Sequence, residues 1–240
     1  MLNFPQIYLG IFSLFISGLA FLNILYCYYF DLLLDIKSFF FIFLFCLIFS
    51  TLNFFKKKNI NKISIYEKIF TVILGYILIP VILAVPYYLT LNNINFFDAY
   101  FESVSGFTST GFSIFNNLKH LNESLILWRS STQWIGGLYF LISIILLIDI
   151  FDKNLKESLT NFISLNTGET LRQSIKISII YLLLTIVIFI ALSISGIRFF
   201  NSFNLSLSFI SSGGFLPDNG LDSIVTNKFQ EIIISLSMLL

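Results

Sequence analysis

Five long apolar stretches constrain this chain more than any other feature of its sequence: residues 7–30, 38–55, 69–91, 125–151 and 177–197. A bilayer core about 30 Å thick needs about 20 apolar residues of helix to cross it, and each stretch meets or approaches that length. A sixth apolar run begins near Lys228 and reaches only to Leu240, too short to cross at about 1.5 Å per residue. The sequence therefore predicts an all-α integral membrane protein, and we expect the N-terminal piece of a longer one.

The composition agrees with exposure to lipid and argues against several classes of soluble protein. Charged residues make up 11% of the chain, less than half of the roughly 25% that is typical of soluble globular domains. The net charge of +1 and the lack of a basic stripe argue against a nucleic-acid partner. Cys27 and Cys46 both lie inside apolar runs, so we expect buried hydrophobic residues rather than a disulfide or a zinc site.

Basic residues gather in two of the connecting segments. These residues are Lys56, Lys57, Lys58 and Lys62 in one segment, and Lys153, Lys156, Arg172 and Lys176 in the other. The positive-inside rule assigns both segments to the cytoplasm. Residues 92–124 and the stretch after residue 197 are then expected on the outer side.

Segment 92–124 is too apolar for an ordinary surface loop. Its first half, NFFDAYFESVSGF, has Phe97, Phe101 and Val104 at helical spacing, and its second half, TSTGFS, is small, polar and contains glycine. Irregular backbone at membrane depth is tolerated only where protein surrounds it or where it lines a water-filled cavity. The pattern therefore predicts a half-helix followed by a re-entrant loop.

The same pattern occurs a second time, 103 residues further along. Residues 94–112, INFFDAYFESVSGFTSTGF, align without a gap on residues 197–215, IRFFNSFNLSLSFISSGGF, with eight of 19 positions identical. Each unit reads as a span, a half-helix, a glycine-containing loop and a span in the same orientation. Parallel repeats arrange themselves about an axis normal to the membrane, so the two loops are expected to meet at a shared centre.

The chemistry of these loops suits a desolvated cation. Backbone carbonyls can replace the hydration shell of an ion, and glycine reaches the unusual dihedral angles that such a strand requires. We therefore expect Gly111 and Gly214 to have a conformational role, and Gly111→Ser to weaken selectivity among cations with little effect on folding. The half-helices would also direct their partially negative C-terminal ends at the centre.

At these residues the chain resembles the TrkH/KtrB potassium transporter family. The resemblance runs from about residue 66 to the end and is most specific in FESVSGFTSTG, WRSSTQWIGG and SFISSGGF; the first two spans match more loosely. It implies four covalently joined span–pore-helix–span units around one potassium pore, of which two are present here. It also implies two quarters of a selectivity filter, formed by Ser109, Thr110, Gly111 and Phe112 and by Ser212, Gly213, Gly214 and Phe215.

The resemblance also implies an organisation and a set of partners. Residues 1–62 would be an N-terminal helix pair with a basic loop, 63–152 the first pore unit, and 153–240 the second unit with a truncated last helix. The expected function is potassium uptake by a multi-pass protein of the bacterial inner (plasma) membrane, with no enzymatic activity and no cofactor besides the transported ion. The implied partners are a second copy of the full-length protein and a cytosolic nucleotide-binding subunit of the TrkA/KtrA type.

Arg129 is the most unusual charge within a predicted span. An intramembrane arginine is a functional candidate by default. We expect either an ion pair with Asp98 or Glu102 that braces the filter, or a direct electrostatic effect on the ion path.

Two other classes of function remain as alternatives. A secondary transporter for another small cation or solute usually combines inverted repeats with an ionisable residue at mid-membrane, whereas these repeats are parallel. An intramembrane hydrolase would need a base beside a loop serine, and the one histidine, His120, is predicted in an outer turn. Both alternatives rank below a potassium pore.

Overall fold

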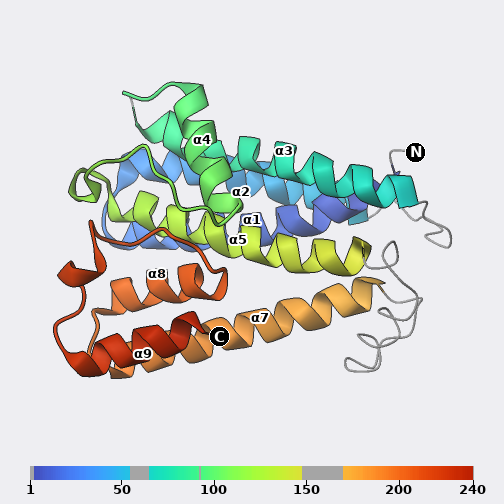
Figure 1. Ribbon diagram of the computed structural model, residues 1–240. Coiled ribbons are helices and arrows are strands. Elements are labelled where there is room, and N and C mark those ends of the chain that lie inside the picture. Colours follow the sequence, from blue (N-terminus) through green and yellow to red (C-terminus); the bar gives the residue numbers. More distant parts are fainter. Residues whose placement is uncertain (1–2, 55–64, 92, 148–169, 240) are drawn as a thin grey trace.

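The computed structural model describes residues 3–54, 65–91, 93–147 and 170–239 (Figure 1). Its five long helices are α1 (Asn3–Tyr29), α2 (Leu33–Phe54), α3 (Ile65–Thr90), α5 (Glu123–Leu147) and α7 (Thr170–Ile194). All five are long and apolar enough to cross a membrane. The prediction of an all-α membrane fold with five spans is therefore confirmed.

The observed helices differ from the predicted apolar stretches mainly where a helix extends into polar residues. The fifth span was predicted to begin at residue 177, whereas α7 begins at Thr170 and includes Lys176. Hydropathy detects the part of a helix that lipid can surround, and a helix continues beyond it wherever its backbone hydrogen bonds can form.

Shorter elements follow α3 and α7 in the same order. α4 (Phe96–Phe107) and η1 (Leu118–His120) precede α5, and α8 (Phe199–Ile210) and η3 (Leu221–Ser223) precede α9 (Lys228–Met238). α4 and α8 are each 12 residues long and begin 103 residues apart, as do η1 and η3. The predicted repeat is therefore present in the backbone as well as in the sequence.

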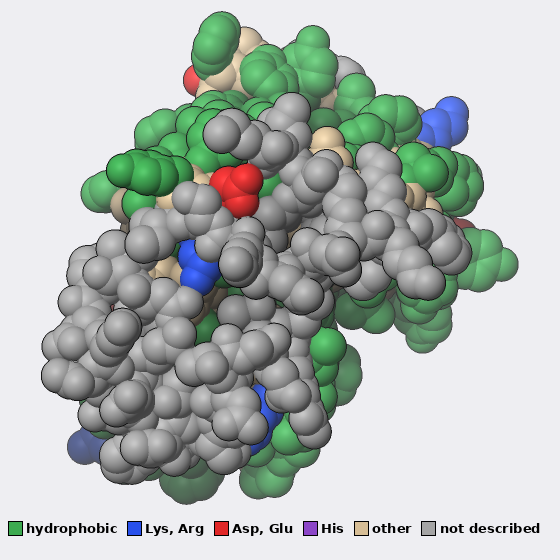
Figure 2. All heavy atoms as spheres, turned by 90° about the vertical axis from the view of Figure 1, so that its right-hand side faces the viewer, with side chains coloured by type: hydrophobic (Ala, Val, Ile, Leu, Met, Phe, Trp, Pro, Cys, Tyr) green, Lys and Arg blue, Asp and Glu red, His purple; other side chains and the backbone are tan. Residues whose placement is uncertain are grey.

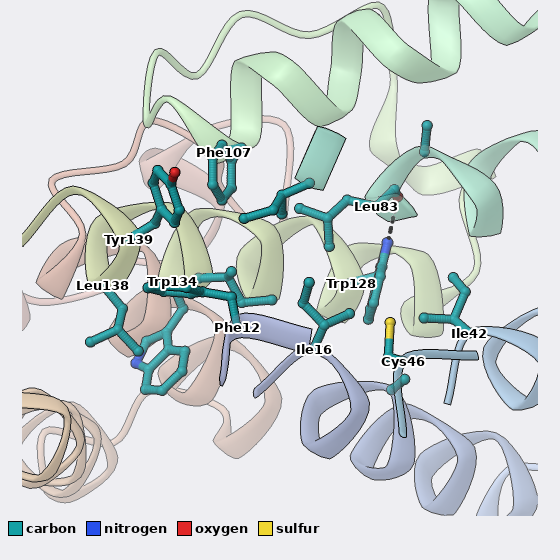
Figure 3. Packing of buried hydrophobic residues seen from close by; sticks show 14 of the residues in the cluster. Phe12, Ile16, Ile42, Cys46, Leu83, Phe107, Trp128, Trp134, Leu138 and Tyr139 are labelled. Carbon is teal, nitrogen blue, oxygen red and sulfur yellow. Dashed lines mark hydrogen bonds between the residues drawn. The ribbon is translucent and has the colours of Figure 1, made fainter. Parts of the chain in front are cut away.

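α5 is the central helix of the bundle (Figure 1). Within its span 72% of the residues are buried, compared with 28–44% in the other four spans. Figure 3 shows Trp128 of α5 donating a hydrogen bond of 3.0 Å to the carbonyl of Leu83. Tyr139, further along the same helix, has its ring centroid 4.8 Å from that of Phe12 and 5.2 Å from that of Phe107. α5 thus joins the N-terminal helix pair to the end of α4.

The outer faces of the other spans carry large apolar side chains, as a lipid-facing surface requires. Phe41 on α2 is 58% exposed and Val187 on α7 is 56% exposed. Figure 2 views the molecule from its right-hand end in Figure 1, and hydrophobic side chains surround the visible flanks. Cys27 and Cys46 are buried free thiols, as predicted.

Two predictions fall on residues outside the described ranges. Most of the basic residues that set the orientation lie in 55–64 and 148–169, and so do the unit boundaries at 62 and 152. The orientation in the membrane and the division into three domains stay predictions.

Candidate ion-filter site

The two glycine-containing loops follow the C-terminal ends of α4 and α8. We call residues 108–112 the first loop and residues 211–215 the second loop. In the first, the backbone N–H of Thr110 donates to the carbonyl of Ser105 at 3.0 Å; in the second, Gly213 donates to Ser208 at 2.8 Å. These two bonds are also 103 residues apart, so the backbone leaves α4 and α8 by the same turn.

The loops touch each other at their glycines. A Cβ built on Gly111 would lie 2.6 Å from the Cα of Gly214, and a Cβ built on Gly214 would lie 3.2 Å from the Cα of Gly111. Because real Cβ atoms are essentially never found below 3.0 Å, residue 111 cannot carry a side chain without displacing the second loop. The two repeats therefore meet at one centre, as the parallel arrangement predicts.

This contact corrects two expectations about the glycines. Gly111 does have a left-handed φ of +80°, but Gly214 does not; the matching left-handed residues are Ser109 at φ +55° and Ser212 at φ +52°. Gly214 is required for close approach rather than for its dihedral angle. The expectation that Gly111→Ser leaves folding almost unchanged is also wrong, because both the left-handed backbone and the contact oppose a side chain there.

The two loops differ in what covers them. Phe112 at the end of the first loop is 69% exposed, whereas its counterpart Phe215 is 2% exposed. The ring of Phe215 lies under the guanidinium of Arg129, with 4.1 Å between the arginine Cζ and the ring centroid. The first loop therefore lacks, in the described part of the chain, the cover that α5 gives to the second.

Arg129 sits in a buried network just behind the first loop. Its Nε donates to Glu102 Oε1 at 2.8 Å, and the two side chains are 3% and 0% exposed. Its Nη2 donates at 3.0 Å to the hydroxyl of Ser113, which itself donates to Glu102 at 3.1 Å. The other carboxylate oxygen of Glu102 accepts the backbone N–H of Ile114 at 2.9 Å. The ion pair thus fixes the chain where it leaves the first loop.

Glu102, and not Asp98, is the carboxylate that pairs with Arg129. Asp98 lies in the first turn of α4, where its backbone N–H donates to the side chain of the N-cap residue Asn95 at 2.8 Å. The two acidic residues lie about 6 Å apart along the helix axis, and Glu102 is the one at the level of Arg129. The ion pair expected with Asp98 or Glu102 is therefore made by Glu102, and the bracing of the filter by this pair stays a prediction.

Gln133 makes the corresponding contact with the second loop, and sequence reasoning did not assign it a role. It is fully buried on α5, one turn after Arg129. With its amide oriented to satisfy both ends, its oxygen accepts the backbone N–H groups of Gly214 at 3.0 Å and Phe215 at 2.9 Å. Its nitrogen then donates to the hydroxyl of Ser208 at 2.9 Å. The signal in the sequence was two polar side chains one turn apart in an apolar span.

Small residues on α5 allow both half-helices to approach it. A Cβ on Gly136 would lie 1.9 Å from the carbonyl oxygen of Phe107, and a Cβ on Gly137 would lie 2.8 Å from the Cβ of Ser211. The adjacent glycines thus contact the last residue of α4 and the residue after α8. One helix therefore holds both loops, by packing and by hydrogen bonds.

The segments after the loops are also tied to each other. The side chain of Asn219 accepts the backbone N–H of Leu118 at 2.8 Å and donates to Asn117 at 3.0 Å. His120 lies at the end of η1 and is exposed. These contacts join the segments that follow the two loops.

Comparisons with known proteins agree with this fold. A family model described as TrkH, a cation transport protein, matches residues 35–240. An uncharacterized cation transporter of Methanocaldococcus jannaschii is 32% identical, over 74% of this chain and 37% of that protein. The Trk system potassium uptake protein TrkH of Escherichia coli K12 is 26% identical, over 66% of this chain and 34% of that protein.

A solved structure extends the comparison to three dimensions. The crystal structure of the potassium transporter TrkH from Vibrio parahaemolyticus matches 98% of this chain with a TM-score of 0.74 and 21% identity. The match covers 49% of that chain. The chain thus spans about a third to a half of the length of these three relatives.

Proposed function

Because the chain belongs to the TrkH cation transport protein family, we propose that its two loops form part of a selectivity filter through which potassium ions enter the cell. Backbone carbonyls of Ser109, Thr110, Gly111 and Phe112 and of Ser212, Gly213, Gly214 and Phe215 would replace water around the ion. The proposed function requires no cofactor, because the ion only exchanges the oxygens of water for the carbonyl oxygens of the loops.

The observation that carries the proposal is the contact between two equivalent loops. Two half-helices of equal length end at Phe107 and Ile210, and each is followed by a left-handed serine and a glycine that meets its counterpart. The C-terminal ends of both half-helices carry partial negative charge, which favours a cation where the loops meet. A secondary transporter more often combines inverted repeats, whereas these two units run in the same direction.

The exposed Phe112 supports a filter with more than two loops. In the second loop Phe215 is covered by Arg129, which belongs to the preceding unit. By the same relation Phe112 would be covered by a further unit, which the described residues do not contain. We therefore propose that further loops complete the ring, as the four-unit architecture implied by the resemblance requires.

The resemblance supports three further parts of the proposal. Glycine in both visible loops favours potassium over sodium. The full-length protein would act as a homodimer with a cytosolic nucleotide-binding subunit of the TrkA/KtrA type. It would lie in the bacterial inner membrane as a multi-pass protein, a location with which its five apolar spans agree.

Ion uptake by the whole polypeptide that the gene encodes tests the proposal. The assay is rubidium and sodium uptake in cells lacking their own potassium uptake systems. In Gly214→Ser the Cβ would lie 3.2 Å from the Cα of Gly111, so the first loop must shift by a few tenths of an ångström. We expect a smaller loss of folded protein than in Gly111→Ser, together with reduced rubidium-over-sodium selectivity. Gly111→Ser, with its 2.6 Å contact, should reduce the amount of folded protein as well.

The alternatives give different results in the same assay. Uptake of another cation or of a solute without rubidium uptake would favour the secondary transporter. Unchanged selectivity in folded Gly214→Ser would remove the filter assignment, because the substitution lies where the loops meet.

A further inference from the structure

A second feature of the molecule lies outside the ion path, in a groove between α1 and α8. The groove has a volume of about 650 Å³ and an almost entirely apolar lining. Leu22 and Leu25 of α1 form one wall, Phe203 of α8 and Phe189 of α7 form another, and Leu127 of α5 contributes beneath them. Arg198, the residue just before α8, is the one charged residue in the lining.

The groove occupies the depth of one leaflet. The residues that α1 contributes run from Leu22 to Tyr29, which is the last residue of that helix. This part of α1 is roughly 10 Å long at about 1.5 Å per residue, which is less than half the thickness of a bilayer core about 30 Å across. Apolar surface at this depth does not hold water, because a buried water needs polar partners.

Arg198 remains available to an anion at the rim. Its Nη2 donates to Glu123 Oε1 at 2.7 Å, yet its side chain is 64% exposed. A guanidinium carries five N–H donors, and the described residues engage one of them by this bond. Glu123 is shared with the hydroxyl of Tyr26, so the carboxylate does not belong to Arg198 alone.

The N-terminus of α8 adds a second feature that favours an anion. α4 is capped by the side chain of Asn95, but Arg198 stands at the equivalent position of α8 and makes no side-chain cap bond. The first backbone N–H groups of α8 therefore lack the partner that those of α4 have. Uncapped helix N-termini and arginine both favour phosphate oxygens.

We propose that this groove binds a glycerophospholipid of the leaflet at the outer ends of the spans, with an acyl chain between α1 and α8 and its phosphodiester on Arg198. The apolar lining with one cation at its rim matches a chain that ends in an anionic head.

The bound lipid would contact the helices that hold the second loop. Phe203 belongs to α8, which leads into that loop, and Leu127 precedes Arg129 by two residues on α5. Filling the groove should therefore stabilise α8 against α5. This consequence does not depend on which ion the filter selects.

Lipid retention by the purified protein tests the proposal. The protein is extracted from membranes, exchanged into detergent, supplied with dioleoylphosphatidylglycerol and examined by native mass spectrometry and thermal unfolding. We expect one retained phosphatidylglycerol per chain and a raised unfolding temperature. Dioleoylglycerol, which has the same chains without phosphate, should bind at least tenfold more weakly, and inorganic phosphate alone should not stabilise the protein.

Two variants and a matched control make the test specific to the groove. Leu22→Trp fills the groove and should lower retention at least tenfold, and Arg198→Gln should remove the preference for the phosphate. Leu14→Trp is the control, because Leu14 is a leucine of similar exposure on the same helix, outside the lining. Retention by Leu22→Trp equal to that by Leu14→Trp would overturn the proposal. So would a groove that stays lipid-free in the whole polypeptide because a protein segment fills it.

Discussion

Replacing Gln133 by leucine tests whether α5 holds the second loop in its filter conformation. Leucine fills a similar volume but accepts no hydrogen bond, so the backbone N–H groups of Gly214 and Phe215 lose their acceptor. Phe215 is 2% exposed, so its N–H is left without a partner at a cost of about 1–3 kcal/mol. Gly214 is exposed, so water can compensate part of its loss. We expect a total of about 2–4 kcal/mol.

The cost falls on the loop, so two measurements should change together. A penalty near 2 kcal/mol lowers the ratio of ordered to disordered loop about 30-fold. We expect purified Gln133→Leu to unfold at lower temperature, and the whole polypeptide carrying it to lose rubidium-over-sodium selectivity. A loss of stability alone would indicate a packing role without influence on the filter.

Ser208→Ala is the matched control. It removes the bond that the Gln133 amide donates at 2.9 Å and leaves both accepted bonds in place. Because Gln133 is fully buried, its amide nitrogen is left without that acceptor at a cost of about 1–3 kcal/mol. This variant should therefore lose stability but keep its selectivity. If Gln133→Leu behaves like Ser208→Ala in both measurements, the two accepted bonds do not hold the loop and the reasoning is refuted.

Two other substitutions follow from the packing around α5. Glu102→Gln leaves the buried Arg129 without a charged partner, which typically costs about 3–5 kcal/mol. We expect a large fall in the folded fraction by size-exclusion chromatography in detergent, and a normal profile would mean that the ion pair contributes little. Gly136→Ala puts a Cβ 1.9 Å from a backbone oxygen of α4 and should prevent the native packing, whereas Gly18→Ala meets nothing within 4 Å and should fold normally. Equal thermal stability of these two glycine variants would contradict the close approach of α4 to α5.

The spans and the repeat could be predicted because their signals are local. The length of an apolar run decides whether a helix can cross the bilayer, independently of what the helix packs against. The half-helices were predicted from helical spacing and from a following run of small residues, and both were found within one or two residues of the expected place. The offset of 103 residues held in the backbone because the two units repeat their turn chemistry as well as their composition.

The bracing residues could be predicted only in part. Arg129 is conspicuous in an apolar span, and two carboxylates lay within reach in the sequence. Which carboxylate pairs with it depends on the rotation of α4 against α5, and that rotation selected Glu102. Gln133 carries no charge, and its position one turn after Arg129 was the one signal for it; that signal does not say which backbone groups the side chain meets.

By itself the sequence determined that this chain is a bundle of membrane helices with two re-entrant loops, because burial of apolar length and turn chemistry are properties of short segments. Only the tertiary structure decided how those loops are held. The contact of Gly111 with Gly214 and the bonds made by the two polar residues of α5 depend on how helices far apart in the chain approach one another. Such approaches are set by packing, which is a property of the whole fold.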